Sequence, residues 1–110
     1  MTRFKAEQLF EKLAAHFLPD RRVSAGTGFG SNPGLRVGGK IFAMLVRGEL
    51  VVKLPRERVD ELVKKGTGAA FDAGKGRPMK EWVTVPVRAG RQWERLADEA
   101  FHFVGAASQR

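Results

Sequence analysis

Residues 37–55 decide the fold of this chain, and they read VGGKIFAMLVRGELVVKLP. Two-residue hairpin turns require positive φ angles, which glycine adopts at little cost. The stretch contains two pairs that suit such turns, and each borders an apolar run. It therefore predicts antiparallel strands joined by tight turns, and we expect a meander of about three strands over residues 23–54. The two turn pairs are Gly38-Gly39 and Arg47-Gly48.

The run IFAMLV, residues 41–46, is apolar at every position. Successive side chains of a strand point to opposite faces, so a strand without a polar face is typical of the centre of a sheet that is covered on both sides. Helices can cover one face, whereas the second needs a further helix, a second protomer or a ligand. One of the two alternating sets of the run lies on that second face, together with Trp82 from a later strand. The two sets are Phe42, Met44 and Val46, or Ile41, Ala43 and Leu45. With the even-numbered set, we expect an interaction face formed by Phe42, Met44 and Trp82.

Amphipathic helices are predicted on both sides of this meander. An apolar stripe over residues 9–17 indicates a first helix, which should end at Leu18 because Pro19 follows. A short second helix begins at Pro55, and a third covers residues 91–105. In the second helix, the residues expected to face the core are Val59, Leu62 and Val63, and Gly66 closes it.

Two more strands are predicted between the second and third helices, over residues 70–72 and 79–87. In the longer one, Val83, Val85 and Val87 should share a face. Helices that alternate with an antiparallel sheet in this way indicate an α+β fold. We expect a two-layer sandwich with about five strands in the order α-β3-α-β2-α, as one domain over residues 1–110.

Composition narrows the setting and the partners. The chain has 110 residues, a formal charge of +8 and no cysteine. The positive charge favours anionic partners such as nucleic acid, acidic proteins or phosphorylated ligands, or it serves only solubility. Absence of cysteine fits a reducing cytoplasm, and we expect neither a signal peptide nor a membrane span.

The sequence offers no catalytic constellation. The glycine-rich run 26–30 is followed by a turn, whereas a dinucleotide-binding loop must open a helix. His16 and His102 have no second histidine or carboxylate at a metal-ligand spacing, and no nucleophile stands beside them. We read Asp98-Glu99 as a solvated helix face. We therefore expect no enzyme activity, no cofactor and no metal.

Positive charge is unevenly distributed. Residues 21–48 contain no Asp or Glu, and residues 75–91 contain only Glu81. Cations on hairpins and loops beside an aromatic side chain can follow a phosphate backbone and stack on a base. Trp82 is such an aromatic, although we favour its packing in the core. The predicted nucleic-acid-binding residues are Arg36, Lys40, Arg47, Lys75, Arg77 and Lys80.

A family resemblance rests on the same stretch. The run VGGKIFAMLVRGELVVKLP, a short helix and the run FDAGKGRPMKEWVTVP follow one another. This arrangement resembles the N-terminal domain of TfoX/Sxy-type competence regulators and the related MmcQ/YjbR-like small proteins, over about residues 28–104. The resemblance implies a compact α+β fold of the kind also seen in secretion chaperones, and an association with transcriptional regulation or DNA binding. A Gly-Phe-Gly-Ser segment stands where TfoX proteins have Met-Phe-Gly-Gly, so a competence role is not carried over.

These observations favour a non-enzymatic cytoplasmic binding or regulatory domain that contacts nucleic acid. The alternative is a protein-interaction module that forms a homodimer or docks a partner through the apolar sheet face. A third possibility is a small-molecule pocket lined by Phe29, Phe71, Trp82 and Trp93.

Overall fold

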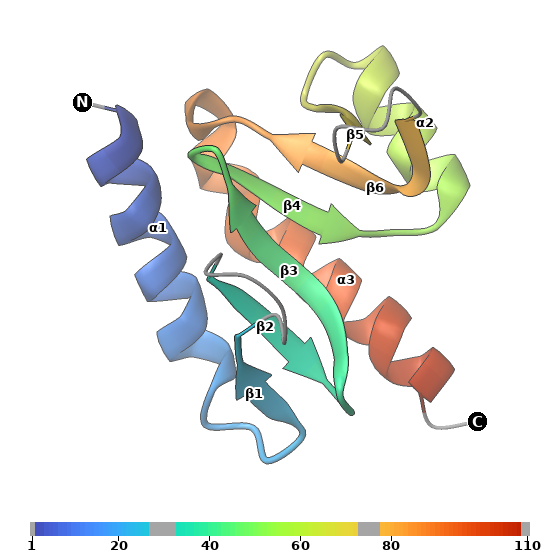
Figure 1. The fold of residues 1–110 in the computed structure, drawn as a ribbon. Coiled ribbons are helices and arrows are strands. Elements are labelled where there is room, and N and C mark those ends of the chain that lie inside the picture. Colours follow the sequence, from blue (N-terminus) through green and yellow to red (C-terminus); the bar gives the residue numbers. More distant parts are fainter. Residues whose placement is uncertain (1, 27–32, 73–77, 109–110) are drawn as a thin grey trace.

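A computed structural model describes residues 2–26, 33–72 and 78–108 of the chain. Its sheet has six strands, which are antiparallel to their neighbours and lie in the order β1-β2-β3-β4-β6-β5 (Figure 1). The predicted α+β fold is confirmed, with one strand more than expected because residues 23–37 form two short strands that pair with each other. The strands are β1 (Val23–Ala25), β2 (Gly34–Val37), β3 (Lys40–Val46), β4 (Glu49–Lys53), β5 (Ala69–Asp72) and β6 (Pro78–Val85).

Both predicted hairpin turns are present. Gly38 and Gly39 have φ angles of 58° and 84°, and Arg47 and Gly48 have 52° and 76°. Two successive positive φ angles define the type I′ turn, whose twist matches that of the flanking strands. Arg47 is the only residue other than glycine with a positive φ in the described part of the chain. The pairing Val46↔Glu49 places it at the tip of the β3–β4 hairpin.

Three helices pack on one face of the sheet. They are α1 (Thr2–Phe17), α2 (Arg56–Lys64) and α3 (Trp93–Ser108), and a 3-10 helix, η1 (Val87–Gln92), leads into α3. Figure 1 views the molecule from the opposite face, with α3 passing behind β3 and β4. Within the described residues, no helix has both the length and the apolar character needed to cross a membrane.

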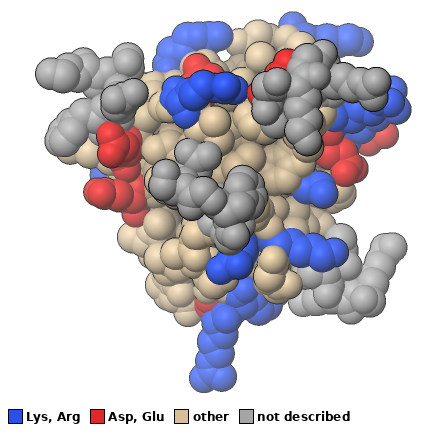
Figure 2. All heavy atoms as spheres, in the orientation of Figure 1, with Lys and Arg blue, Asp and Glu red and all other residues tan. Residues whose placement is uncertain are grey.

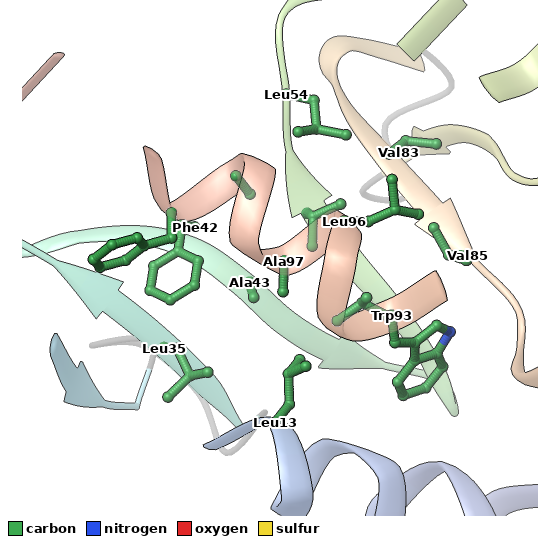
Figure 3. Packing of buried hydrophobic residues seen from close by; sticks show 14 of the residues in the cluster. Leu13, Leu35, Phe42, Ala43, Leu54, Val83, Val85, Trp93, Leu96 and Ala97 are labelled. Carbon is green, nitrogen blue, oxygen red and sulfur yellow. The ribbon is translucent and has the colours of Figure 1, made fainter. Parts of the chain in front are cut away.

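One large hydrophobic core lies between these helices and the sheet. Side chains of α3 face the central strands in Figure 3, where Leu96 and Ala97 lie over Ala43 and Val83. Trp93 is buried at the start of α3, and its Nε1 donates a hydrogen bond to the Pro86 carbonyl at 3.2 Å. The helices contribute Ala6, Phe10, Leu13, Phe17, Val59, Leu62, Trp93, Leu96, Ala97, Ala100, Phe101 and Val104.

The prediction that Phe42 shares a face with Met44 and Trp82 is wrong. Between β2 and β3 the register shifts, so that Leu35 pairs with Ala43 whereas Arg36 pairs with Ile41. Phe42 is the extra residue of this β-bulge, and a bulge interrupts the alternation of side chains. Its fully buried ring therefore lies in the helix-covered core, with ring centroids 5.2 Å from Phe17 and 5.5 Å from Phe101.

A second, smaller cluster occupies the other face of the sheet. Met44, Val51 and Phe71 are buried there, and Ile41, Val46 and Trp82 pack around them. These residues come from β3, β4, β5 and β6, so one cluster spans four adjacent strands. Near it the Arg47 guanidinium donates a hydrogen bond to the Asp72 carbonyl at 3.2 Å, although β4 and β6 separate β3 from β5 in the sheet. This contact joins the tip of the β3–β4 hairpin to the end of β5.

Several element ends differ from the predictions. The last long strand ends at Val85 instead of residue 87, because Pro86 begins the turn into η1. The third helix continues past Gly105 to Ser108. Val63 of α2 lies outside the core and is 41% exposed, whereas Val59 and Leu62 are buried as predicted.

Candidate nucleic-acid interface

A hollow on the described surface lies between α2 and the β5–β6 hairpin, and we call it the α2–β6 groove. Its volume is about 420 Å³. One wall is a stripe of α2, in which five residues recur at steps of three and four and so share a face of the helix. The other wall comes from β5 and β6. The lining residues are Arg56, Val59, Asp60, Val63, Lys64, Ala70, Met79 and Lys80.

An irregularity in β6 shapes this groove. From Ala70 to Phe71 the β5 strand advances by one residue, but their partners in β6 are Val83 and Met79. Residues 80–82 therefore have no partner in β5, although Trp82 remains paired with β4. Bulges of this kind redirect side chains and are frequent beside functional sites.

A second, shallower hollow adjoins the groove at this bulge. It is lined by Lys53, Arg56, Met79, Lys80, Glu81 and Trp82, so the two hollows share three residues. The combined surface leads from α2 across the bulge of β6 to the half-buried indole of Trp82.

The floor of the groove is apolar. Val63 and Met79 are 41% and 40% exposed. Leu18 is the one other large hydrophobic residue among those described that is comparably exposed. Exposed apolar side chains gathered in a hollow are typical of a contact surface, whereas single scattered ones need no explanation.

The rim of the groove is basic. Arg56, Lys64 and Lys80 are exposed, and none of them forms an ion pair with another described residue. Lys53 is held only loosely, with its Nζ 3.9 Å from Glu81 Oε1 and 5.8 Å from the centroid of the Trp82 ring. The groove therefore holds three cations without an ion-pair partner among the described residues and one exposed carboxylate, Asp60, while Lys53 beside it has only long contacts.

Arg58 shows the contrast on the same helix. Its Nε and a terminal nitrogen donate hydrogen bonds to the two Glu99 carboxylate oxygens, at 2.8 Å and 3.1 Å, and it also pairs with Glu61. The hydrogen bonds to Glu99 raise the pKa of Arg58 above its usual value. Its charge is thus neutralised within the fold. The interpretation of Glu99 as a solvated residue is wrong, because it joins α3 to α2.

The six predicted nucleic-acid-binding residues do not form one patch. Lys40 is the first residue of the seven-residue strand β3 and Arg47 follows its last residue, so the two lie roughly 23 Å apart at about 3.3 Å per residue. Arg36 is half-buried, with a terminal nitrogen 3.4 Å from the Ala25 carbonyl and a buried Nε that has no partner among the described residues. Lys80 alone lies in the groove. Figure 2 shows the Lys and Arg side chains in separate groups around this face. Lys75 and Arg77 lie outside the described residues.

The predicted interaction face is likewise divided. Phe42 lies on the helix-covered side, Met44 is only 7% exposed, and Trp82 keeps a partly exposed surface beside the groove. The proposed small-molecule pocket is wrong for a related reason. Trp93 lies in the helix-side core, whereas Phe71 and Trp82 lie on the opposite face, and Phe29 is outside the described residues.

The histidines have carboxylate neighbours that the sequence interpretation missed. His16 Nδ1 lies 3.5 Å from Glu94 Oε1, and His102 Nε2 lies 3.7 Å from Asp98 Oδ2. His102 and Asp98 are four residues apart on α3, which is a spacing visible in the sequence. Both histidines are exposed at the surface. Among the residues that the structure describes, no three His, Asp or Glu side chains are grouped to hold a metal ion.

The residues that sequence reasoning missed are Arg56, Asp60, Val63, Lys64, Ala70 and Met79 in the groove and Lys53 in the adjoining hollow. The sequence contained a signal for three of them, because Arg56, Val63 and Lys64 recur at steps of three and four residues and so share one face of α2. Their meeting with β6 depends on tertiary structure.

Comparison with known proteins agrees with the order of elements. The YjbR family model matches residues 19–103, which cover all the strands, α2, η1 and most of α3. No curated protein and no solved structure matches the chain significantly. The predicted resemblance to MmcQ/YjbR-like proteins is thereby confirmed. This chain belongs to the YjbR family.

Proposed function

We propose that this domain binds nucleic acid through the α2–β6 groove and performs no chemistry on it. The observation that carries the proposal is a groove with three cations, Arg56, Lys64 and Lys80, that have no ion-pair partner among the described residues; the groove also has apolar lining and adjoins the hollow of Trp82. Phosphate groups suit the cations, and bases suit the apolar and aromatic surface. Three carboxylates, Asp20, Glu61 and Glu99, have Lys or Arg partners outside the groove, whereas Asp60 lines it and Glu81 lines the adjoining hollow.

The charge of the whole chain supports the same proposal. A formal charge of +8 creates a positive field that steers anions toward the protein and raises their encounter rate. Binding then gains free energy because phosphate contacts release counterions, and this gain falls as salt rises. The global field acts at long range, while the groove provides the place of contact.

Fluorescence anisotropy across a salt series tests the proposal. Fluorescein-labelled 12-nucleotide single strands and 12-base-pair duplexes are titrated with the protein between 25 and 200 mM KCl, values chosen to span the range in which phosphate contacts weaken. We expect binding at low salt and a linear fall of log K with log salt. Absence of binding to every oligonucleotide at 25 mM KCl would refute the proposal.

Two triple variants separate the groove from net charge. Arg56→Gln/Lys64→Gln/Lys80→Gln removes three groove cations, and Lys5→Gln/Lys12→Gln/Arg91→Gln removes three exposed cations elsewhere. Both chains carry a formal charge of +5. For a single strand, the groove variant should lose about 2 from the salt slope, at about 0.7 per lost phosphate contact, while the control keeps its slope. An equal loss in both variants would contradict the location.

The alternative is that the domain self-associates or docks a protein through its apolar sheet face. Little surface supports it, because Phe42 is fully buried under the helices and Met44 is 7% exposed. The hypothesis predicts a concentration-dependent mass in light scattering that Trp82→Ala reduces. A monomer at all concentrations would exclude self-association through this face.

A further inference from the structure

From the shape and lining of the α2–β6 groove, we infer that the nucleic acid bound there is single-stranded, with an unstacked base against Met79 and Trp82. This inference rests on the proposed function and specifies its ligand. Its key observation is the combination of apolar and cationic side chains in one groove. The apolar residues in the lining are Val59, Val63, Ala70 and Met79, the cations are Arg56, Lys64 and Lys80, and Asp60 is the single carboxylate.

The apolar floor favours exposed bases. A duplex presents phosphates outward and keeps its bases stacked inside, so Val63 and Met79 would gain no apolar contact from it. A single strand can turn a base toward the floor while its flanking phosphates reach the rim. Proteins that bind single strands combine a positive groove with platforms for bases in this way.

The concave shape favours the same ligand. Base readout in the major groove of a duplex uses a helix or ribbon that protrudes into a groove about 12 Å wide. Here the exposed stripe of α2 is one wall of a hollow, and β6 is the other. A hollow of about 420 Å³ lies in the size range of small-ligand sites, so it suits one nucleotide unit at a time.

Trp82 completes the site as an aromatic surface. One side of it packs against the cluster of Met44, Val51 and Phe71, which fixes its position. Lys53 lies over the ring, but its contacts of 5.8 Å to the ring and 3.9 Å to Glu81 are long. When Lys53 binds a phosphate group of the ligand, its ammonium group moves away from the Trp82 ring. A base can then stack on the ring surface that is exposed.

Tryptophan fluorescence tests this arrangement directly. The chain has two tryptophans, and Trp93 is 1% exposed with its indole nitrogen hydrogen-bonded to Pro86. Unlabelled dT12 should therefore quench Trp82 alone, and Trp82→Phe should abolish the quenching. In a competition at 25 mM KCl, we expect dT12 to bind at least tenfold more tightly than a 12-base-pair duplex, because one stacked base is worth roughly that much.

Neutral substitutions on the floor distinguish base contacts from phosphate contacts. Val63→Gln/Met79→Gln should weaken dT12 binding about tenfold without changing the salt slope, whereas Lys80→Gln should lower the slope by about 0.7. Leu18→Gln is the matched control, because Leu18 is 41% exposed and lies outside the groove. It should leave binding unchanged.

The outcomes separate this inference from the proposed function. If neither oligonucleotide binds, both fail. If the duplex binds as tightly as dT12 and the floor variant binds like wild type, the groove still binds nucleic acid through its cations, but the single-strand assignment is overturned. Quenching that persists in Trp82→Phe would overturn the placement of the base.

Discussion

Replacing Arg58 with Ala should destabilise the domain more than any other loss of a surface charge. Arg58 is 20% exposed, and it grips both oxygens of Glu99, which is 34% exposed, at 2.8 Å and 3.1 Å. Exposed ion pairs contribute about 0.2–1 kcal/mol, and hydrogen bonds to charged groups about 1.5–3 kcal/mol. This partly buried pair lies between those limits, at about 1–2 kcal/mol.

Thermal unfolding followed by circular dichroism at pH 7 measures the effect. For a chain of this length, a loss of about 1–2 kcal/mol lowers Tm by about 4–9 °C. The control is Glu61→Gln, which removes the exposed partner of Arg58 on the same helix together with its ion pair to Lys65 and leaves the contact with Glu99 in place. That variant should change Tm far less. If Arg58→Ala lowers Tm no more than Glu61→Gln does, then the bridge between α2 and α3 does not stabilise the fold.

Three further predictions concern the fold. The hydrogen bonds of Arg22 lower the pKa of Asp20 from 3.8 to about 2. The stabilisation by this pair is therefore full above pH 4 and is lost as the pH falls through 2. NMR titration of the Asp20 carboxyl carbon should show the lowered pKa, and an ordinary pKa would contradict it. Phe42→Ala should cost about 3–5 kcal/mol in urea unfolding, because the ring is fully buried under the helices; a loss below 1 kcal/mol would place it on the other face. Gly68→Ala should destabilise the α2–β5 connection, since a Cβ would lie 2.6 Å from the Thr84 carbonyl oxygen; an unchanged urea midpoint would contradict that close approach.

Local sequence signals predicted much of the fold. The pairs Gly38-Gly39 and Arg47-Gly48 identified both tight hairpins, because their backbone requirement is local. The apolar repeats identified all three helices. The observed ends of the elements differ from the predicted ends where two local signals conflict. The alternation of valines suggests a strand that continues to residue 87, but Pro86 ends β6 two residues earlier.

Two features could not be predicted because they depend on irregular strand pairing. Strict alternation placed Phe42 beside Met44, but a bulge opposite Leu35 and Arg36 turns Phe42 to the helix side. The bulge of residues 80–82 likewise shapes the groove, and nothing in the sequence marks it.

The candidate site was predicted only in part for the same reason. An excess of cations in the hairpin region suggested binding there, yet Lys40 and Arg47 lie at opposite ends of one strand. Lys80, one of the predicted residues, is exposed and lies in the groove, but its cationic neighbours there, Arg56 and Lys64, come from α2. Only the packing of that helix against β5 and β6 brings them together.

Binding of nucleic acid at the α2–β6 groove is tested most directly by amide chemical shifts. ¹⁵N-labelled protein is titrated with dT12 at 25 mM KCl, and the shift changes are mapped onto the sequence. The largest changes should fall on residues 79–82 of β6 and on the exposed stripe of α2 from Arg56 to Lys64. Changes centred on Lys40 or Arg47, or no changes at all, would contradict the assignment of the groove.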